Sequence, residues 1–157
     1  MNKQTKIPKV IHYCWFGRQP LPQSVVKCIE SWKRFCPDYE IIQWNEDNYD
    51  ITKNNFMINA YNNKKYAFVS DYVRLDVLYK FGGIYLDTDV EIIKNWDDLL
   101  NDEMFFALEA PGVVATGLGL GSIKKQELLK ENMNFYDKII IEPDAPFHKI
   151  ICTGYTS

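Results

Sequence analysis

A pair of glycines, Gly82-Gly83, separates two patterns of different period in the middle of this chain of 157 residues. Before the pair, apolar residues recur at helical spacing over Tyr66–Phe81, and a glycine directly after such a run is typical of a helix end. After the pair, residues 84–92 alternate between apolar side chains with Thr88 and the carboxylates at 87, 89 and 91. This alternation predicts a strand with one buried face. A helix is therefore expected to lead directly into a strand, as in α/β folds.

The rest of the chain repeats this alternation of strands and helices. Further strands are predicted over Lys9–Phe16, Tyr39–Trp44, Met104–Leu108 and Lys138–Glu142, and helices after Pro22, over Asn54–Asn63 and over Lys124–Phe135. This order predicts an α/β fold with a mostly parallel central sheet flanked by helices. Neither an internal repeat nor a linker indicates a second domain, so residues 1–157 are expected to form one domain.

Composition excludes several classes of protein. Apolar residues make up 46% of the chain, which argues against disorder, and a net charge of −3 with scattered basic residues argues against a nucleic-acid partner. No segment reaches the roughly 18 apolar residues of a membrane span, although attachment to a membrane surface stays open. The four cysteines form no Cys-x-x-Cys pair and no apolar leader precedes them, which predicts reduced core thiols and a cytoplasmic location; they are Cys14, Cys28, Cys36 and Cys152.

The carboxylates of the alternating run point to chemistry. On one strand face, Asp87 and Asp89 would lie about 6.6 Å apart, where two charges repel by about 2.5 kcal/mol at an effective dielectric near 20. A hard divalent cation such as Mg²⁺ or Mn²⁺ removes this repulsion, and a metal held by two carboxylates keeps positions open for substrate phosphates. The pattern therefore predicts a metal–diphosphate site. The alternative is an acidic edge strand that discourages aggregation.

The helix before the glycines carries two polar arcs, whereas a surface helix normally has one. Asp76 and Lys80 form the first arc and are expected to be a solvent-facing ion pair. Ser70, Asp71 and Arg74 form the second. Either Asp71 and Arg74 pair to hold the helix to a neighbouring loop, or Arg74 faces a phosphate, which suits its planar fork of donors, while Asp71 faces a sugar hydroxyl.

Two segments, Ile7–Gly17 and Phe68–Asp89, resemble sugar transferases with the Asp-x-Asp motif, the group called glycosyltransferase family 32. Capsular polysaccharide enzymes and mannosyltransferases belong to this group. The resemblance covers roughly the first two-thirds of the chain. It implies a GT-A-type fold and transfer of a sugar from a nucleotide-sugar donor with retention at the anomeric carbon, in polysaccharide or capsule biosynthesis.

The resemblance also implies roles for individual residues. Trp15 matches a tryptophan that stacks on the donor's nucleobase, and Asp71 and Arg74 match residues that contact the sugar nucleotide. Asp87 and Asp89 match the pair that binds Mn²⁺ (or Mg²⁺), with Asp89 the more direct ligand and Asp87 also contacting ribose or the donor sugar. Together with Arg74 they are the expected catalytic residues. By family frequency a UDP-sugar is preferred to a GDP-sugar.

The resemblance leaves the acceptor and the C-terminus open. A saccharide or lipid-linked oligosaccharide is the expected acceptor, with peripheral association at the inner face of the membrane. Family chains usually run further and supply a late His, Ser or Trp segment, which is absent before Ser157. The chain is therefore expected to be a donor-binding portion, truncated at its C-terminus. A nucleotide-sugar-binding fragment without transfer activity is an alternative.

A phosphatase of the haloacid dehalogenase type is the weaker alternative. Such phosphatases carry the Asp-x-Asp motif near the N-terminus and a second acidic pair much later in the chain. Here the motif lies in the middle of the chain, and Asp97-Asp98 follows it too closely. Two other features are not assigned to donor binding. His12 lies within a buried strand and is expected to be a core histidine. Thr116–Gly121 lacks the spacing of a phosphate-binding loop and is interpreted as a flexible acceptor-side loop or a plain turn.

Overall fold

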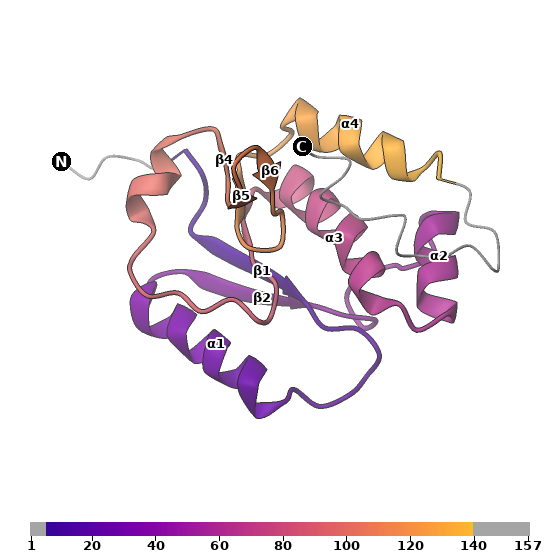
Figure 1. The fold of residues 1–157 in the computed structure, drawn as a ribbon, viewed down its shortest axis with the longest axis horizontal. Coiled ribbons are helices and arrows are strands. Elements are labelled where there is room, and N and C mark those ends of the chain that lie inside the picture. The colour runs from indigo at the N-terminus through magenta and orange to yellow at the C-terminus, as the bar shows by residue number, and fades with distance from the viewer. Residues whose placement is uncertain (1–5, 140–157) are drawn as a thin grey trace.

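The computed structural model describes residues 6–139. Its helices and strands, shown in Figure 1, are β1 (Val10–Cys14), α1 (Gln23–Phe35), β2 (Glu40–Trp44), α2 (Asn55–Asn62), α3 (Tyr66–Phe81), β3 (Gly83–Tyr85), the 3₁₀ helix η1 (Asp97–Asn101), β4 (Met104–Phe106), β5 (Leu108–Ala110), β6 (Val113–Val114), β7 (Leu120–Ser122) and α4 (Glu127–Tyr136). None of the helices in this range combines the length and the apolar character that a membrane crossing requires.

Five strands form the central sheet in the order β2-β1-β3-β7-β4. β1 pairs in parallel with β2 and β3, whereas β7 is antiparallel to both β3 and β4. Four strands therefore run in one direction and only β7 opposes them. This arrangement confirms the predicted α/β class with a mostly parallel sheet. β5 and β6 form a separate two-stranded sheet.

Helices cover both faces of the sheet. Figure 1 shows α1 on one side of β1 and β2 and α3 on the other, with α2 and α4 beside α3. Side chains of β1 alternate between the two faces: Ile11 and Tyr13 join the apolar cluster around α1, and Cys14 joins the cluster around α3. Because both faces are covered, β1 is a buried central strand.

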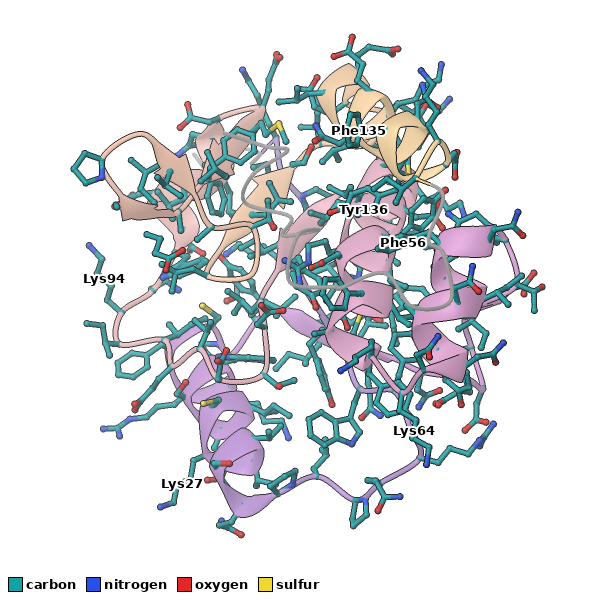
Figure 2. All side chains as sticks on the ribbon, turned by 45° about the vertical axis from the view of Figure 1, so that its right-hand side comes forward. Lys27, Phe56, Lys64, Lys94, Phe135 and Tyr136 are labelled. Atoms are coloured by element: carbon teal, nitrogen blue, oxygen red, sulfur yellow. The ribbon has the colours of Figure 1, made fainter. Side chains whose placement is uncertain are left out.

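The layer of α2, α3 and α4 is held together by aromatic side chains. Phe56 of α2 and Tyr136 of α4 meet edge to face with ring centroids 4.9 Å apart, and Figure 2 shows the two rings side by side. Tyr72 of α3 contacts the same Tyr136 ring at 6.2 Å. Phe135 points outward and is largely exposed. These contacts seat α3 between the sheet and the other two helices, which fixes the helix that carries the second polar arc.

α3 has the bounds that the sequence predicts, and it ends where Gly82 takes a positive φ of 66°. The Gly82 N–H donates to the carbonyl oxygen of Leu78 at 2.8 Å. Glycine adopts a positive φ with little strain because it has no Cβ, which explains why the glycine marks the end of the helix.

The first polar arc of α3 faces solvent only in part, because Lys80 is exposed, as expected, whereas Asp76 is buried. Asp76 is only 6% exposed. Its Oδ2 accepts hydrogen bonds from Lys80 at 2.7 Å, from Lys53 at 2.6 Å and from the Tyr49 hydroxyl at 2.6 Å. The ion pair with Lys80 is present, but residues between β2 and α2 cover it. Burial alone would raise the pKa of the Asp76 carboxyl, and these donors outweigh burial and lower it.

The predicted strand over residues 84–92 is wrong beyond its first residues, because β3 ends at Tyr85. The Val90 N–H donates to the Asp87 carbonyl at 3.2 Å, which closes a turn. The chain then packs on α1: Trp32 donates to the Val90 carbonyl at 2.8 Å, and Ser31 accepts from the Ile92 N–H at 2.9 Å. These bonds to α1 replace a sheet ladder. The alternating apolar residues are nevertheless buried in one cluster, which comprises Ile84, Leu86 and Ile92.

Smaller differences concern the second half of the chain. The predicted strand over Met104–Leu108 is divided between β4 and β5, and α4 begins at Glu127 rather than at Lys124. The predicted loop Thr116–Gly121 ends in β7, the strand between β3 and β4, so a flexible loop is wrong for that part. Most of the predicted strand Lys138–Glu142 lies outside the described residues.

His12 is a core histidine, as predicted. The Trp44 indole N–H donates to its Nδ1 at 3.1 Å, so Nε2 carries the proton and donates to the Gly82 carbonyl at 2.8 Å. The side chain is fully buried. Burial lowers the pKa of His12 from 6.5 to about 4, although its bond to Gly82 acts in the opposite direction.

This lowered pKa makes the stability of the fold depend on pH. The unfolded chain takes up the His12 proton below about pH 6.5 and the folded chain only below about pH 4, so stability falls between these values. We expect the free energy of unfolding in urea to be about 2 kcal/mol lower at pH 5 than at pH 7.5 from this residue alone. His12→Gln keeps one donor and one acceptor but does not titrate, and should flatten the dependence. Equal slopes for the two proteins would contradict this assignment.

Candidate functional site

A cavity of about 440 Å³ opens where β1 and β3 end. The two strands are parallel, so their carboxyl ends share one edge of the sheet, which is where open α/β sheets bind ligands. The first residues of α3 complete the wall. The lining residues are Cys14, Trp15, Phe16, Gln19, Tyr66, Ala67, Ser70, Arg74, Tyr85, Asp87, Thr88 and Asp89.

Arg74 of α3 links several acidic and polar groups at the base of this cavity. Its Nη2 lies 3.0 Å from Oδ1 of Asp71 and 3.1 Å from Oδ1 of Asp87. Its Nη1 donates to Thr116 Oγ1 at 2.8 Å, and its guanidinium lies 4.8 Å from the centre of the Tyr85 ring. The residue is only 4% exposed. A buried cation held in this way has a fixed direction, and its fork of donors suits a phosphate or a carboxylate.

Asp87 is held from three sides. Its Oδ1 accepts from Arg74 and, at 3.1 Å, from the Tyr85 hydroxyl. Its backbone N–H donates to the Gly117 carbonyl at 2.7 Å. The side chain is 40% exposed. The carboxylate is therefore both anchored to the protein and accessible from the cavity.

Asp89 differs from Asp87 in its setting. It is exposed at the cavity, and within residues 6–139 its carboxylate forms no ion pair. Over the same residues, no group of three or more His, Cys, Asp or Glu side chains is arranged to hold a metal ion. Asp87 and Asp89 could thus hold Mg²⁺ or Mn²⁺ only with further oxygen ligands from water or from a substrate phosphate, which is how these metals are commonly bound. The donor set fits a metal–diphosphate complex and does not fit a structural zinc site.

Trp15 also lines the cavity. Its indole N–H donates to the Gln19 carbonyl at 2.7 Å, which orients the ring, and its backbone N–H donates to the Trp44 carbonyl at 2.9 Å. The side chain stays partly exposed. Gly17, with a φ of 94°, then lets the chain pass Tyr66, since a Cβ at this position would overlap the tyrosine ring. A partly exposed indole that is held by a hydrogen bond is suited to stacking on a planar group.

Four of the five predicted site residues line one cavity: Trp15, Arg74, Asp87 and Asp89. Asp71 is buried behind Arg74. The ion pair between Asp71 and Arg74 is present, as the first interpretation of the second polar arc expects. That Arg74 faces a phosphate stays a prediction, and Arg74 lines the cavity where one could bind. Glu109, an acidic residue near a predicted strand end, is exposed on β5 and does not line the cavity.

Three neighbours of Arg74 and Asp87 were not predicted: Tyr85, Thr116 and Gly117. For Tyr85 a signal was present, because it has the same parity as Asp87 and lies two residues before it. Thr116 and Gly117 reach the site through the β7 pairing. The sequence carried no signal for this non-local contact.

The one cysteine that lines the cavity, among the described residues, is not a reactive thiol. Cys14 lines the cavity, but burial raises the pKa of its thiol to about 12, so it stays protonated at neutral pH. Cys14, Cys28 and Cys36 are free thiols, and Cys14 and Cys36 are buried as predicted, whereas Cys28 is half-buried. Cys152 lies outside the described residues.

Comparisons with known proteins agree with this geometry. Residues 22–106 match the family model described as the glycosyltransferase sugar-binding region containing the DXD motif. Inositol phosphoceramide mannosyltransferase 3 of Schizosaccharomyces pombe is 30% identical over 121 residues, which are 74% of this chain and 34% of that protein. Mannosyl phosphorylinositol ceramide synthase SUR1 of Saccharomyces cerevisiae is 25% identical over 143 residues, or 87% of this chain and 37% of that protein.

Among solved structures, the PaToxG glycosyltransferase matches with a TM-score of 0.64 and 18% identity, over 82% of this chain and 59% of that chain. This likeness supports a GT-A-type fold. The chain spans about a third of the length of the two yeast relatives that it matches.

Proposed function

The chain belongs to the glycosyltransferases with a sugar-binding region containing the DXD motif, and from this premise we propose that it binds a nucleotide-sugar donor and transfers the sugar to an acceptor. The observation that carries the proposal is the cavity that the buried Arg74, the accessible Asp87 and Asp89, and Trp15 line together. We treat residues 1–157 as the donor-binding portion of one domain. Asp87, Asp89 and Arg74 are the proposed catalytic residues, and Trp15 completes the donor site. Asp71 supports this site through its ion pair with Arg74 and does not line the cavity.

Sugar transfer breaks the bond between the anomeric carbon and the diphosphate, and the electron pair stays on the diphosphate oxygen. Arg74 would stabilise this developing charge, since a preorganised cation in a partly buried site acts more strongly than in water. Asp87 and Asp89 would hold a divalent metal, which when bound supplies a second positive charge for the same diphosphate. Trp15 would stack on the nucleobase and so position the donor.

The finer assignments follow the family resemblance. We propose Mn²⁺ or Mg²⁺ as the metal and a UDP-sugar in preference to a GDP-sugar as the donor. Two relatives are named for mannosyl transfer to inositol phosphoceramide or for its product, so a hexose and a lipid-linked or saccharide acceptor fit this chain. Attack by the acceptor on the face that the diphosphate leaves, with retention, is proposed because the lining residues within the described range include no carboxylate besides Asp87 and Asp89 that could act as a nucleophile. A role in capsule or polysaccharide synthesis, in the cytoplasm at the inner face of the membrane, belongs to the same proposal.

Donor binding without transfer is the second candidate. The phosphatase alternative is not retained. Asp87 is engaged by Arg74 and Tyr85 rather than free as a nucleophile, and no lysine is among the described residues that line the cavity.

Turnover of the donor separates the two candidates. The protein should release nucleoside diphosphate slowly from one member of a panel of UDP- and GDP-sugars in the presence of Mn²⁺, and Asp89→Asn should lower this rate by about 100-fold, since it removes an exposed metal ligand but no structural bond. Release should rise when a suitable acceptor is added. Metal-dependent binding without any release would favour the second candidate. A rate that Asp89→Asn leaves unchanged would contradict the proposed site.

A further inference from the structure

We propose that the Thr116-Gly117 turn is a positioning element that sets the direction of both the Asp87 carboxylate and the Arg74 guanidinium. The turn precedes β7 in the chain. The inference rests on the proposed function, in which Asp87 and Arg74 hold the donor's diphosphate. It concerns residues that the family motif does not include.

Gly117 affects Asp87 in two ways: its backbone accepts a hydrogen bond from Asp87, and its lack of a Cβ leaves space for the Asp87 carboxylate. Its carbonyl accepts the Asp87 N–H at 2.7 Å. A Cβ at Gly117 would overlap Oδ2 of Asp87 and lie 3.2 Å from Oδ1. Oδ1 of the same carboxylate accepts from Arg74 and Tyr85, so a shift of the carboxylate away from Gly117 would disturb these bonds. Glycine at this position therefore lets the carboxylate stand where it does.

Thr116 holds Arg74, the other member of the ion pair with Asp87. It is 2% exposed, and its Oγ1 accepts from Arg74 Nη1 at 2.8 Å. Because a guanidinium is planar, this bond to one nitrogen fixes the direction of the other, Nη2, which reaches Asp71 and Asp87. Thr116 and Gly117 thus fix the two ends of one ion pair from adjacent positions in the chain.

The turn itself is tied to the sheet. The Ala115 N–H donates to the Ala107 carbonyl at 2.9 Å, and the Ala107 N–H donates to the Gly119 carbonyl at 2.7 Å. The Leu118 N–H donates to the Ala115 carbonyl at 3.1 Å, which closes the turn, and β7 begins at Leu120. The turn is therefore held on both sides, which a positioning element requires.

The test compares two glycines of the same loop by calorimetric titration of UDP with Mn²⁺ and with EDTA. Gly117→Ala should weaken binding in Mn²⁺ by about tenfold or more, and should change binding in EDTA by less than about twofold. Gly119→Ala is the matched control, because its Cβ would meet Trp96 at 3.1 Å and Ala107 at 3.5 Å rather than the carboxylate. It should bind like the wild type in both conditions. Equal binding by Gly117→Ala and the wild type would overturn the inference.

A second pair of variants covers the case in which Gly117→Ala fails to fold. Thr116→Val keeps the shape but removes the acceptor for Arg74, whereas Thr116→Ser restores it. The expected result is weaker Mn²⁺-dependent binding for Thr116→Val and recovery for Thr116→Ser, and no difference between the two would overturn the role of Thr116. If the wild type itself binds neither UDP nor GDP in Mn²⁺, the proposed function fails instead, and a crystal structure of Gly117→Ala then tests whether the Asp87 carboxylate moves.

Discussion

Arg74→Met is expected to raise the Kd for the nucleotide by at least about thirtyfold, which corresponds to about 2 kcal/mol. The substitution also removes the cation that Asp71 and Asp87 share, and Asp71 is buried. Removing one partner of a buried ion pair costs about 3 kcal/mol or more in the free energy of unfolding. Loss of binding and loss of stability should therefore appear together, measured by calorimetry and by urea denaturation.

A second substitution separates the two effects. Asp71→Asn in the Arg74→Met background removes a buried charge that has lost its cation, so part of the lost stability, about 1 kcal/mol or more, should return. Nucleotide binding should not return, because Asp71 lies behind Arg74 and does not line the cavity. Recovery of binding in the double variant would contradict the role of Arg74 at the diphosphate. Arg74→Lys should bind weakly as well, since an ammonium cannot make the three contacts of the guanidinium fork.

Asp76→Ala is expected to lower the free energy of unfolding by about 3 kcal/mol. Its carboxylate accepts from Lys53, Lys80 and the buried Tyr49 hydroxyl, and the substitution leaves all three donors without this acceptor. Both lysines are partly exposed and can reach water, which places the loss at the lower end of the range for buried pairs. Urea denaturation near neutral pH measures the effect.

Asp38→Ala is the matched control for this loss. Its carboxylate is exposed and pairs with Lys9 at 2.6 Å, so the cost should stay below about 1 kcal/mol. Folded Asp76→Ala should still bind nucleotide like the wild type, because Asp76 does not line the cavity. A loss at Asp76 as small as that at Asp38 would show that the Asp76 contacts add little to stability.

Much of the fold follows from local pattern. α3 has the predicted bounds because apolar periodicity marks the helix and Gly82 marks its end, and β1 and β2 follow from short apolar runs. The main wrong prediction, the strand that was expected to continue to Ile92, has a non-local cause. Residues 87–92 alternate like a strand, yet their backbone is bound by Trp32 and Ser31 of α1, and no local pattern reveals a partner so distant in the chain.

The same limit applies to the candidate site. Arg74 was predicted from the second polar arc of α3, and Asp87 and Asp89 from the acidic run after Gly82-Gly83. Trp15 was predicted only through the family resemblance. The structure places all four around one cavity at the edge where parallel strands end. The argument from two carboxylates on one strand face was nevertheless wrong in its geometry, since both lie in the turn after β3. Thr116 and Gly117 depend on the antiparallel pairing of β7 with β3, which the expectation of a simple loop left out.

Calorimetric titration of UDP, and of GDP in parallel, into the wild-type protein with Mn²⁺ and with EDTA tests the central claim most directly. One nucleotide should bind in Mn²⁺ at least about tenfold more tightly than in EDTA, and Asp89→Ala should abolish this difference. That result would establish a metal-dependent donor site in the cavity. If neither nucleotide binds the wild type in either condition, or if binding is the same in Mn²⁺ and in EDTA, the assignment of Asp87 and Asp89 to a metal–diphosphate site is contradicted.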